Sequence, residues 1–140
     1  MGPARHSYRA HLKSAVATSA APYGYTLTIW TSGAVTTHAR GIPTAWEALL
    51  FLGGAVLGFG VTAALAYGHP GQILAPGEHG SVRLWGGFHL VSVGLAIGGA
   101  ALVTALVKDP VAWMIVGFVS TLVYLVVIAA QFTLADTDPQ

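Results

Sequence analysis

The sequence predicts an all-α transmembrane protein, a four-helix membrane bundle that forms a single integral membrane domain over residues 1–140. Composition is the first observation behind this prediction: 54% of the residues are hydrophobic and only 8% are charged. A soluble domain carries about 25% charged residues, because its surface must face water. The second observation is that the apolar residues gather into segments long enough to cross a bilayer. Lipid is therefore the expected neighbour of most of the surface.

The N-terminal segment is predicted to form a short interfacial helix that lies on the membrane surface. Arg5, Arg9 and Lys13 fall on one helical face, and Tyr8 falls on the adjoining one, which is typical of such a helix. No clear cleavage site follows the short apolar run that ends at Pro22. We therefore do not interpret this segment as a secretory signal.

The first span is predicted at residues 22–39, and it is the most polar of the four. Its hydroxyl-bearing residues are Thr26, Thr28, Thr31, Ser32, Thr36 and Thr37. Because hydroxyl groups favour a protein interface or a wet cavity over lipid, we expect this helix to be interior. A continuous helix that reaches back through residues 14–21, with a kink at Pro22, is an alternative to a separate surface helix.

The other three spans are predicted at residues 46–67, 84–107 and 111–134, and Glu47 is their only charged residue. Each is about 33–36 Å long at 1.5 Å per residue, enough to cross a hydrocarbon core of about 30 Å. Backbone polar groups in lipid must be satisfied within the segment, so these spans are expected to be helices.

The basic residues outside the spans predict the orientation. One side of the membrane is expected to hold Arg5, Arg9, Lys13 and Arg83, and the other to hold Arg40 and Lys108. Positive charge gathers on the cytoplasmic side. We therefore expect a multi-pass protein of the plasma or inner membrane with both termini in the cytoplasm.

A possible internal duplication links the second and fourth spans. Pro43–Trp46 and Pro110–Trp113 share the pattern Pro-x-Ala-Trp at an offset of 67 residues, and Phe51 and Phe118 keep the same register. One interpretation is two independent helix starts, with Pro at the first helical position and Trp at the headgroup level. The other is a helical hairpin repeated in parallel, as in many transporters.

Small residues spaced four apart predict close helix contacts. Gly54 and Gly58 lie on the second span, and Gly94 and Gly98 lie on the third. Such ridges let helices approach closely in lipid, where the hydrophobic effect does not drive association. They predict either packing within the chain or the interface of a homo-oligomer.

The turn between the first two spans carries one candidate site. His38 and Arg40 end the first span, and Glu47 opens the second. One interpretation is that Arg40 and Glu47 pair and, with His38, bind an anion or relay a proton. In the other, Glu47 lies in a first helical turn, where the helix dipole favours an anion, and Arg40 extends to the headgroups.

His89 is the most informative single residue, because it lies inside an otherwise uncharged span. Ionisable residues at such a depth face the bundle interior or water rather than lipid. A pH gate, a hydrogen bond to a solute and a hydrogen bond to a neighbouring helix are the alternatives. Haem ligation by His38 and His89 is not expected, because these residues sit near opposite faces of the membrane.

Several classes of function are excluded. The absence of cysteine removes disulfides, zinc–thiolate sites and iron–sulfur clusters. His69, Glu78 and His79 lack metal-site spacing, and a net charge of +1 offers no basic face to nucleic acid. No phosphate-binding loop, nucleophile elbow or HExxH motif occurs. We predict neither an enzyme nor a bound cofactor or metal.

One stretch resembles a known family. Residues 21–24, Ala-Pro-Tyr-Gly, are followed by Thr31, His38 and Gly41. This pattern resembles the opening of the bacterial acetate–succinate channels, whose signature Asn-Pro-Ala-Pro-Leu-Gly-Leu precedes a Thr and a His-x-x-Gly. The resemblance implies a wet, oligomeric channel for small weak acids, with this helix beside the pore. Ser19-Ala20 replaces the Asn-Pro pair here, and the family has six helices where this chain has room for four.

Together these observations predict a homo-oligomeric channel or facilitator for a weak acid, a neutral solute or a proton. The alternative is a non-catalytic structural or accessory subunit of a larger membrane complex. Candidates for lining the pore or binding the solute are His89, His38, Arg40, Glu47, Thr31 and Tyr23. The expected partners are the lipid bilayer and further copies of the chain.

Overall fold

The computed structural model describes the backbone of residues 3–67 and 87–136, and the side chains of residues 22–66 and 90–131. Four helices make up the described chain, in the order α1 (Pro3–Arg40), α2 (Ala45–Tyr67), α3 (Gly87–Leu106) and α4 (Ala112–Asp136). Within these ranges there is no strand. The prediction of an all-α chain with four helices is confirmed.

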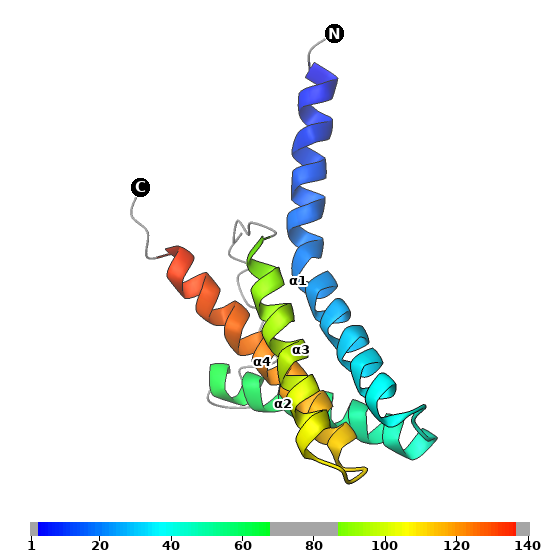
Figure 1. The fold of residues 1–140 in the computed structure, drawn as a ribbon. Helices are drawn as coiled ribbons and strands as arrows, with labels where there is room; N and C mark the ends of the chain where they lie inside the picture. The colour runs from blue at the N-terminus through cyan, green and yellow to red at the C-terminus, as the bar shows by residue number, and fades with distance from the viewer. Residues whose placement is uncertain (1–2, 68–86, 137–140) are drawn as a thin grey trace.

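One continuous helix, α1, replaces the predicted pair of a surface helix and a first span. Pro22 lies inside it, although proline removes one backbone donor and usually bends a helix. The Thr26 hydroxyl donates to the Pro22 carbonyl at 2.9 Å. Figure 1 shows α1 changing direction between its blue and cyan parts. The continuous, bent helix is the alternative that the sequence left open.

Local hydrogen bonds set the turn between α1 and α2. Gly41 follows α1 with a φ of +88°, the left-handed conformation in which helices often end at glycine. The Thr44 backbone N–H donates to Glu47 Oε2 at 2.8 Å, and the Glu47 N–H donates back to Thr44 Oγ1 at 3.3 Å. This reciprocal pair is a capping box, and it starts α2 one residue before the predicted span.

Asp109 has a similar role before α4. The Val111 N–H donates to Asp109 Oδ1 at 2.9 Å, and the Ala112 N–H donates to the Asp109 carbonyl at 3.0 Å. Pro110 loses nothing at this place, because the first amides of a helix have no partner within it. The start of α4 therefore lies within one residue of the prediction. The first three residues of the predicted third span, 84–86, lie outside the described residues.

The helices form an open arrangement. α1 contacts α3 and α4, α3 contacts α4, and α2 contacts α4 alone among the described residues. Figure 1 shows the two turns at one end of the molecule and α2 running across α4 rather than alongside α1. α4 is thus the central helix. One face of α1 is buried, since Thr28, Ser32 and Thr36 are 0% exposed, whereas Trp30 and Tyr23 on its other side are 75% and 65% exposed.

Glycine brings α2 and α4 together. A side-chain carbon on Gly54 would collide with the Met114 backbone, one on Gly58 would lie 2.8 Å from the Phe118 carbonyl, and one on Gly117 would collide with the Phe51 backbone. Here the backbones nearly touch, as small residues permit in membrane helices. Gly94 and Gly98 instead face open space on α3.

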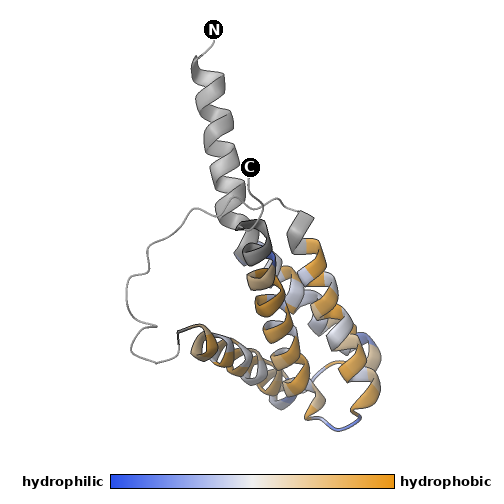
Figure 2. Ribbon diagram, turned by 90° about the vertical axis from the view of Figure 1, so that its left-hand side faces the viewer, coloured by the Kyte–Doolittle hydropathy of each residue, from blue (hydrophilic) through white to orange (hydrophobic). Residues whose placement is uncertain are grey.

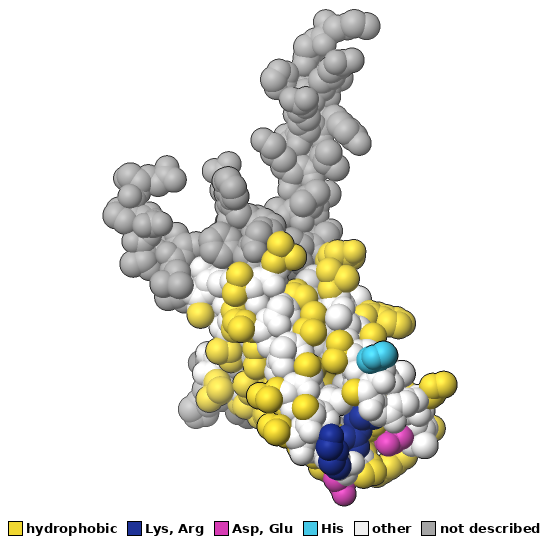
Figure 3. Space-filling view, viewed as in Figure 1, with side chains coloured by type: hydrophobic (Ala, Val, Ile, Leu, Met, Phe, Trp, Pro, Cys, Tyr) yellow, Lys and Arg dark blue, Asp and Glu magenta, His cyan; other side chains and the backbone are white. Residues whose placement is uncertain are grey.

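The outside of the described chain is apolar. Large hydrophobic side chains are exposed on all four helices, for example Trp30, Leu65, Leu90 and Val126. Figure 2 shows hydrophobic residues along the helices and hydrophilic residues at the turns. In Figure 3 the charged side chains in view gather at the end that the turns form.

Two helices are long and apolar enough to cross a membrane, Ala45–Ala66 in α2 and Ala112–Gln131 in α4. In an apolar stretch of 18 residues within each, 44% of the residues are buried in the second helix against 17% in the first, in line with the central place of α4. The described apolar part of α3, Leu90–Leu106, is shorter. Two such helices support an association with membrane, and the four-span topology stays a prediction.

Candidate functional site

Three lines of buried residues, one from each of α1, α3 and α4, face one another inside the molecule. We call them the seam. In each line the residues are four apart, which places them on one helix face. The seam consists of Gly24, Thr28, Ser32 and Thr36 of α1, of Ser92, Ala96, Ala100 and Thr104 of α3, and of Ala112, Val116, Ser120, Tyr124 and Ile128 of α4. All of these residues are small, hydroxyl-bearing or apolar, and none is charged.

Polar contacts between side chains cross the seam at three levels. The Thr36 and Thr104 hydroxyl oxygens lie 3.4 Å apart, and each donates its proton to a backbone carbonyl of its own helix. Next to the seam, the Tyr25 hydroxyl lies 3.1 Å from Thr121 Oγ1. At the end away from the turns, Ser92 Oγ donates to Gln131 Oε1 at 3.2 Å. Hydroxyl groups therefore join α1 and α3 each to a neighbouring helix.

Three threonines of the seam donate hydrogen bonds to backbone carbonyls. Thr28 donates to the Gly24 carbonyl at 2.9 Å, Thr36 to Ser32 at 2.8 Å and Thr104 to Ala100 at 2.8 Å. Bonding to the carbonyl four residues earlier is the usual way for a hydroxyl inside a helix to find a partner.

Two seam hydroxyls differ from the rest. Ser32 Oγ and Ser120 Oγ are buried without a hydrogen-bond partner, and both residues are 0% exposed. A buried hydroxyl without a partner is destabilising, so such groups usually mark an interaction with something else.

Two aromatic rings pack against each other at the seam. The rings of Tyr25 and Tyr124 lie 5.8 Å apart at an angle of 52°, and Tyr124 packs in one buried cluster with Ala96 and Ile128. Tilted aromatic pairs of this kind stabilise packing.

Arg40 lies at the other end of the seam, where it binds the turn that follows α3. Its guanidinium donates to the carbonyls of Val107 and Lys108, each at 2.6 Å, and of Asp109 at 2.9 Å. These carbonyls belong to the turn between α3 and α4, and the Asp109 carbonyl also accepts from the Ala112 N–H at 3.0 Å. Glu47 instead caps α2, and no ion pair joins Arg40 and Glu47 in the described chain. A role for His38, Arg40 and Glu47 in binding an anion or relaying a proton stays a prediction.

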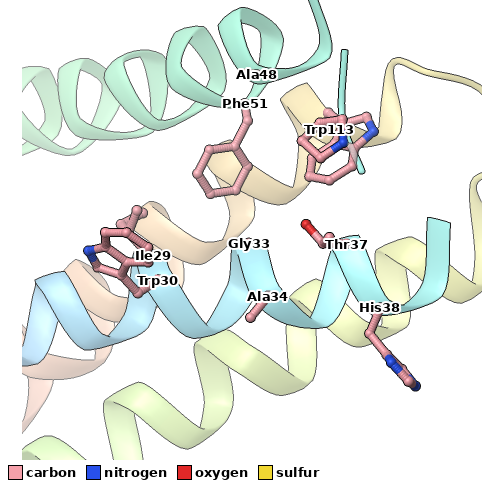
Figure 4. A pocket seen from close by; sticks show the side chains of 10 residues that line it. Ile29, Trp30, Gly33, Ala34, Thr37, His38, Ala48, Phe51 and Trp113 are labelled. Atoms are coloured by element: carbon pink, nitrogen blue, oxygen red, sulfur yellow. The ribbon is translucent and has the colours of Figure 1, made fainter. Parts of the chain in front are cut away.

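A groove opens on the outside, between α1 and α2, with a volume of about 570 Å³. Its lining residues are Ile29, Trp30, Gly33, Ala34, Thr37, His38, Pro43, Ala48, Phe51 and Trp113. A second cavity of about 240 Å³ continues it past Ile29, Trp30 and Phe51. Figure 4 shows the Thr37 hydroxyl on the side of Phe51 and Trp113, whereas His38 points away from both rings. The groove is mainly apolar.

Among the predicted site residues whose side chains are described, no hydrogen bond or ion pair joins any two. Thr31 is half-buried, and Tyr23 and His38 are exposed. His89 is the third residue of α3, but its side chain lies outside the described side chains. Sequence analysis missed the seam residues of α3 and α4. A search for hydroxyl-bearing or small residues four apart would have found Ser92, Ala96, Ala100 and Thr104 of α3, but not the α4 line, which includes Val116 and Ile128.

No protein-family model, curated protein or solved structure matches this chain.

Proposed function

We propose that this chain is a multi-pass membrane protein that lets a small polar species cross the membrane, most directly a proton, water or a protonated weak acid. The proposal rests on where the polar and the apolar side chains lie. The buried polar side chains of the described residues all bear hydroxyls, and large apolar side chains lie outside. A soluble protein has the reverse arrangement, because apolar burial drives its folding.

The seam offers a route for the transported species. Hydrogen-bonding groups follow one another along it, from Ser92 and Gln131 at one end, past Thr121 and Thr36, to the Arg40 end. Their hydroxyls can both donate and accept, which suits a proton or a neutral solute. A permanently charged solute is disfavoured, since no charged side chain lies within the seam to offset its desolvation.

Assembly into homo-oligomers is part of the same proposal. The α1/α2 groove is apolar, and α2 has no contact with α1 across it. In the second half of the chain α4 packs directly on α3. In an oligomer, a helix of a second copy can pack on the groove side of α1, as α4 packs on α3 within one copy. Gly33 in the groove meets nothing within 4 Å, so a helix backbone could approach it closely.

Flux through liposomes tests the transport proposal. We expect purified protein to dissipate a proton gradient, read by an enclosed pH dye, faster than empty liposomes do. Thr36→Val should slow the flux about five- to tenfold, as expected when one hydrogen bond of about 1 kcal/mol is lost from the path. Thr26→Val is the matched control, because Thr26 is an exposed threonine of the same helix.

A second candidate function is an accessory subunit of a larger membrane complex. The hydrogen bonds across the seam favour it, because interhelical hydroxyl pairs also serve simply to join helices. Folded protein that gives no flux above empty liposomes, with or without an acetate gradient, would support this candidate and count against transport.

A further inference from the structure

Two of the buried hydroxyls in the described chain stand apart from the others. Thr28, Thr36 and Thr104 donate to backbone carbonyls of their own helices, whereas Ser32 and Ser120 have no partner. Both serines are 0% exposed, so bulk water does not reach them. Their hydroxyls therefore need a partner within the seam.

Register places these serines in one layer. The hydroxyl oxygens of Thr36 and Thr104 lie 3.4 Å apart, and α1 and α3 run in the same direction (Figure 1). One turn back along both helices, Ser32 is level with Ala100. Tyr124 packs on Ala96, and α4 runs opposite to α3.

The same step of one turn applies to α4. Moving from Ala96 to Ala100 on α3 corresponds to moving from Tyr124 to Ser120 on the antiparallel α4. Ser32, Ala100 and Ser120 thus share a layer, with the Thr36–Thr104 pair on one side and the tyrosine rings on the other.

The composition of this layer suits a small ligand. Serine and alanine are among the smallest side chains, whereas the layers on either side hold threonines or tyrosines. A serine hydroxyl can donate one hydrogen bond and accept others. Buried water in proteins typically joins polar groups that have no other partner, and it makes about three hydrogen bonds.

We propose that the layer of Ser32, Ala100 and Ser120 is an internal water site, in which one or two water molecules bridge the two serine hydroxyls. The site depends on the arrangement of these side chains and not on the transport activity. If transport occurs, the same water joins the Thr36–Thr104 pair to the Tyr25–Thr121 pair.

Water-edited solid-state NMR of the full chain in lipid bilayers tests this site, with water itself as the probe. Magnetisation that starts on water should reach Ser32 and Ser120 severalfold faster than it reaches Ile128, a buried residue of the same α4 line. Transfer to both serines as slow as to Ile128 would overturn the proposal. It would indicate that each serine turns to a carbonyl of its own helix, as Thr28 does.

Substitutions provide an independent test of the water site. In Ser32→Ala with Ser120→Ala, transfer from water to Ala100 should fall severalfold, because the groups that hold the water are gone. Thr28→Ala is the matched control, since its hydroxyl is equally buried but bonded to Gly24. Unchanged transfer to Ala100 in a folded double variant would contradict the site. The wild-type measurement decides the question even if that variant fails to fold.

The NMR and flux experiments separate the two proposals. Serines in contact with water in a protein without flux would support the water site and reject transport. Flux through a protein whose serines receive no magnetisation from water would support transport and reject the site.

Discussion

Two adjacent glycines of α2 have opposite surroundings. Gly54 lies against the Met114 backbone, and an added side-chain carbon would collide with it, whereas Gly53 meets nothing within 4 Å. The difference arises because successive helical residues point about 100° apart. One glycine is therefore required for helix contact, and its neighbour is not.

Thermal unfolding in detergent should separate these two positions. Gly54→Ala should destabilise the protein by about 1–3 kcal/mol, the usual range for overpacking, because backbone is the obstacle and cannot rotate away. Gly53→Ala should be neutral or should stabilise by up to about 1 kcal/mol, since alanine is the better helix former. Equal effects of both substitutions would mean that α2 does not approach α4 at Gly54.

At the scale of the helices, the sequence predicts the elements better than their arrangement. The ends of α2 and α4 follow from local signals, namely Thr44 with Glu47 and Asp109 before Pro110. The seam depends instead on the rotation of three helices about their axes, which distant residues determine together. The central place of α4 was missed because Ser120 and Gly117, on two faces of one apolar span, carry little signal by themselves.

Arg40 joins two helices that are distant in the sequence. Its partners lie 67 to 69 residues away, in the turn that follows α3, so no local pattern predicts them. Arg40→Lys should lower stability by about 1 kcal/mol, because a single ammonium cannot reproduce the planar fork that reaches three carbonyls. Lys108→Gln is the control, as Lys108 is exposed. The midpoint of thermal unfolding is the measurement, and equal midpoints for both variants would contradict this role.

For the whole molecule, the two halves of the chain pack differently. Contacts of α1 with α3 and with the residue after it, Thr36 to Thr104 and Arg40 to Val107, join residues 68 and 67 apart, close to the 67-residue offset of the Pro-x-Ala-Trp pattern. In the second half α4 packs on α3, whereas in the first half α2 leaves α1 and crosses α4. Consequently Trp113 is 3% exposed and its counterpart Trp46 is 66% exposed. The α1/α2 groove is the space that this difference leaves.

The groove therefore provides a test of assembly at the molecular scale. Gly33→Leu should fill the groove without disturbing the fold, because the position meets nothing within 4 Å. If copies of the chain dock there, the oligomer measured by light scattering in detergent should become smaller while the unfolding temperature is kept. Gly60→Leu is the matched control, since Gly60 is an exposed glycine of α2 that also meets nothing within 4 Å.

A wild type that is monomeric in detergent and in cross-linked liposomes, or an oligomer that Gly33→Leu leaves intact, would remove the groove from the assembly proposal. Loss of the oligomer in both variants would instead indicate that the outer face of α2, rather than the groove, carries the contact.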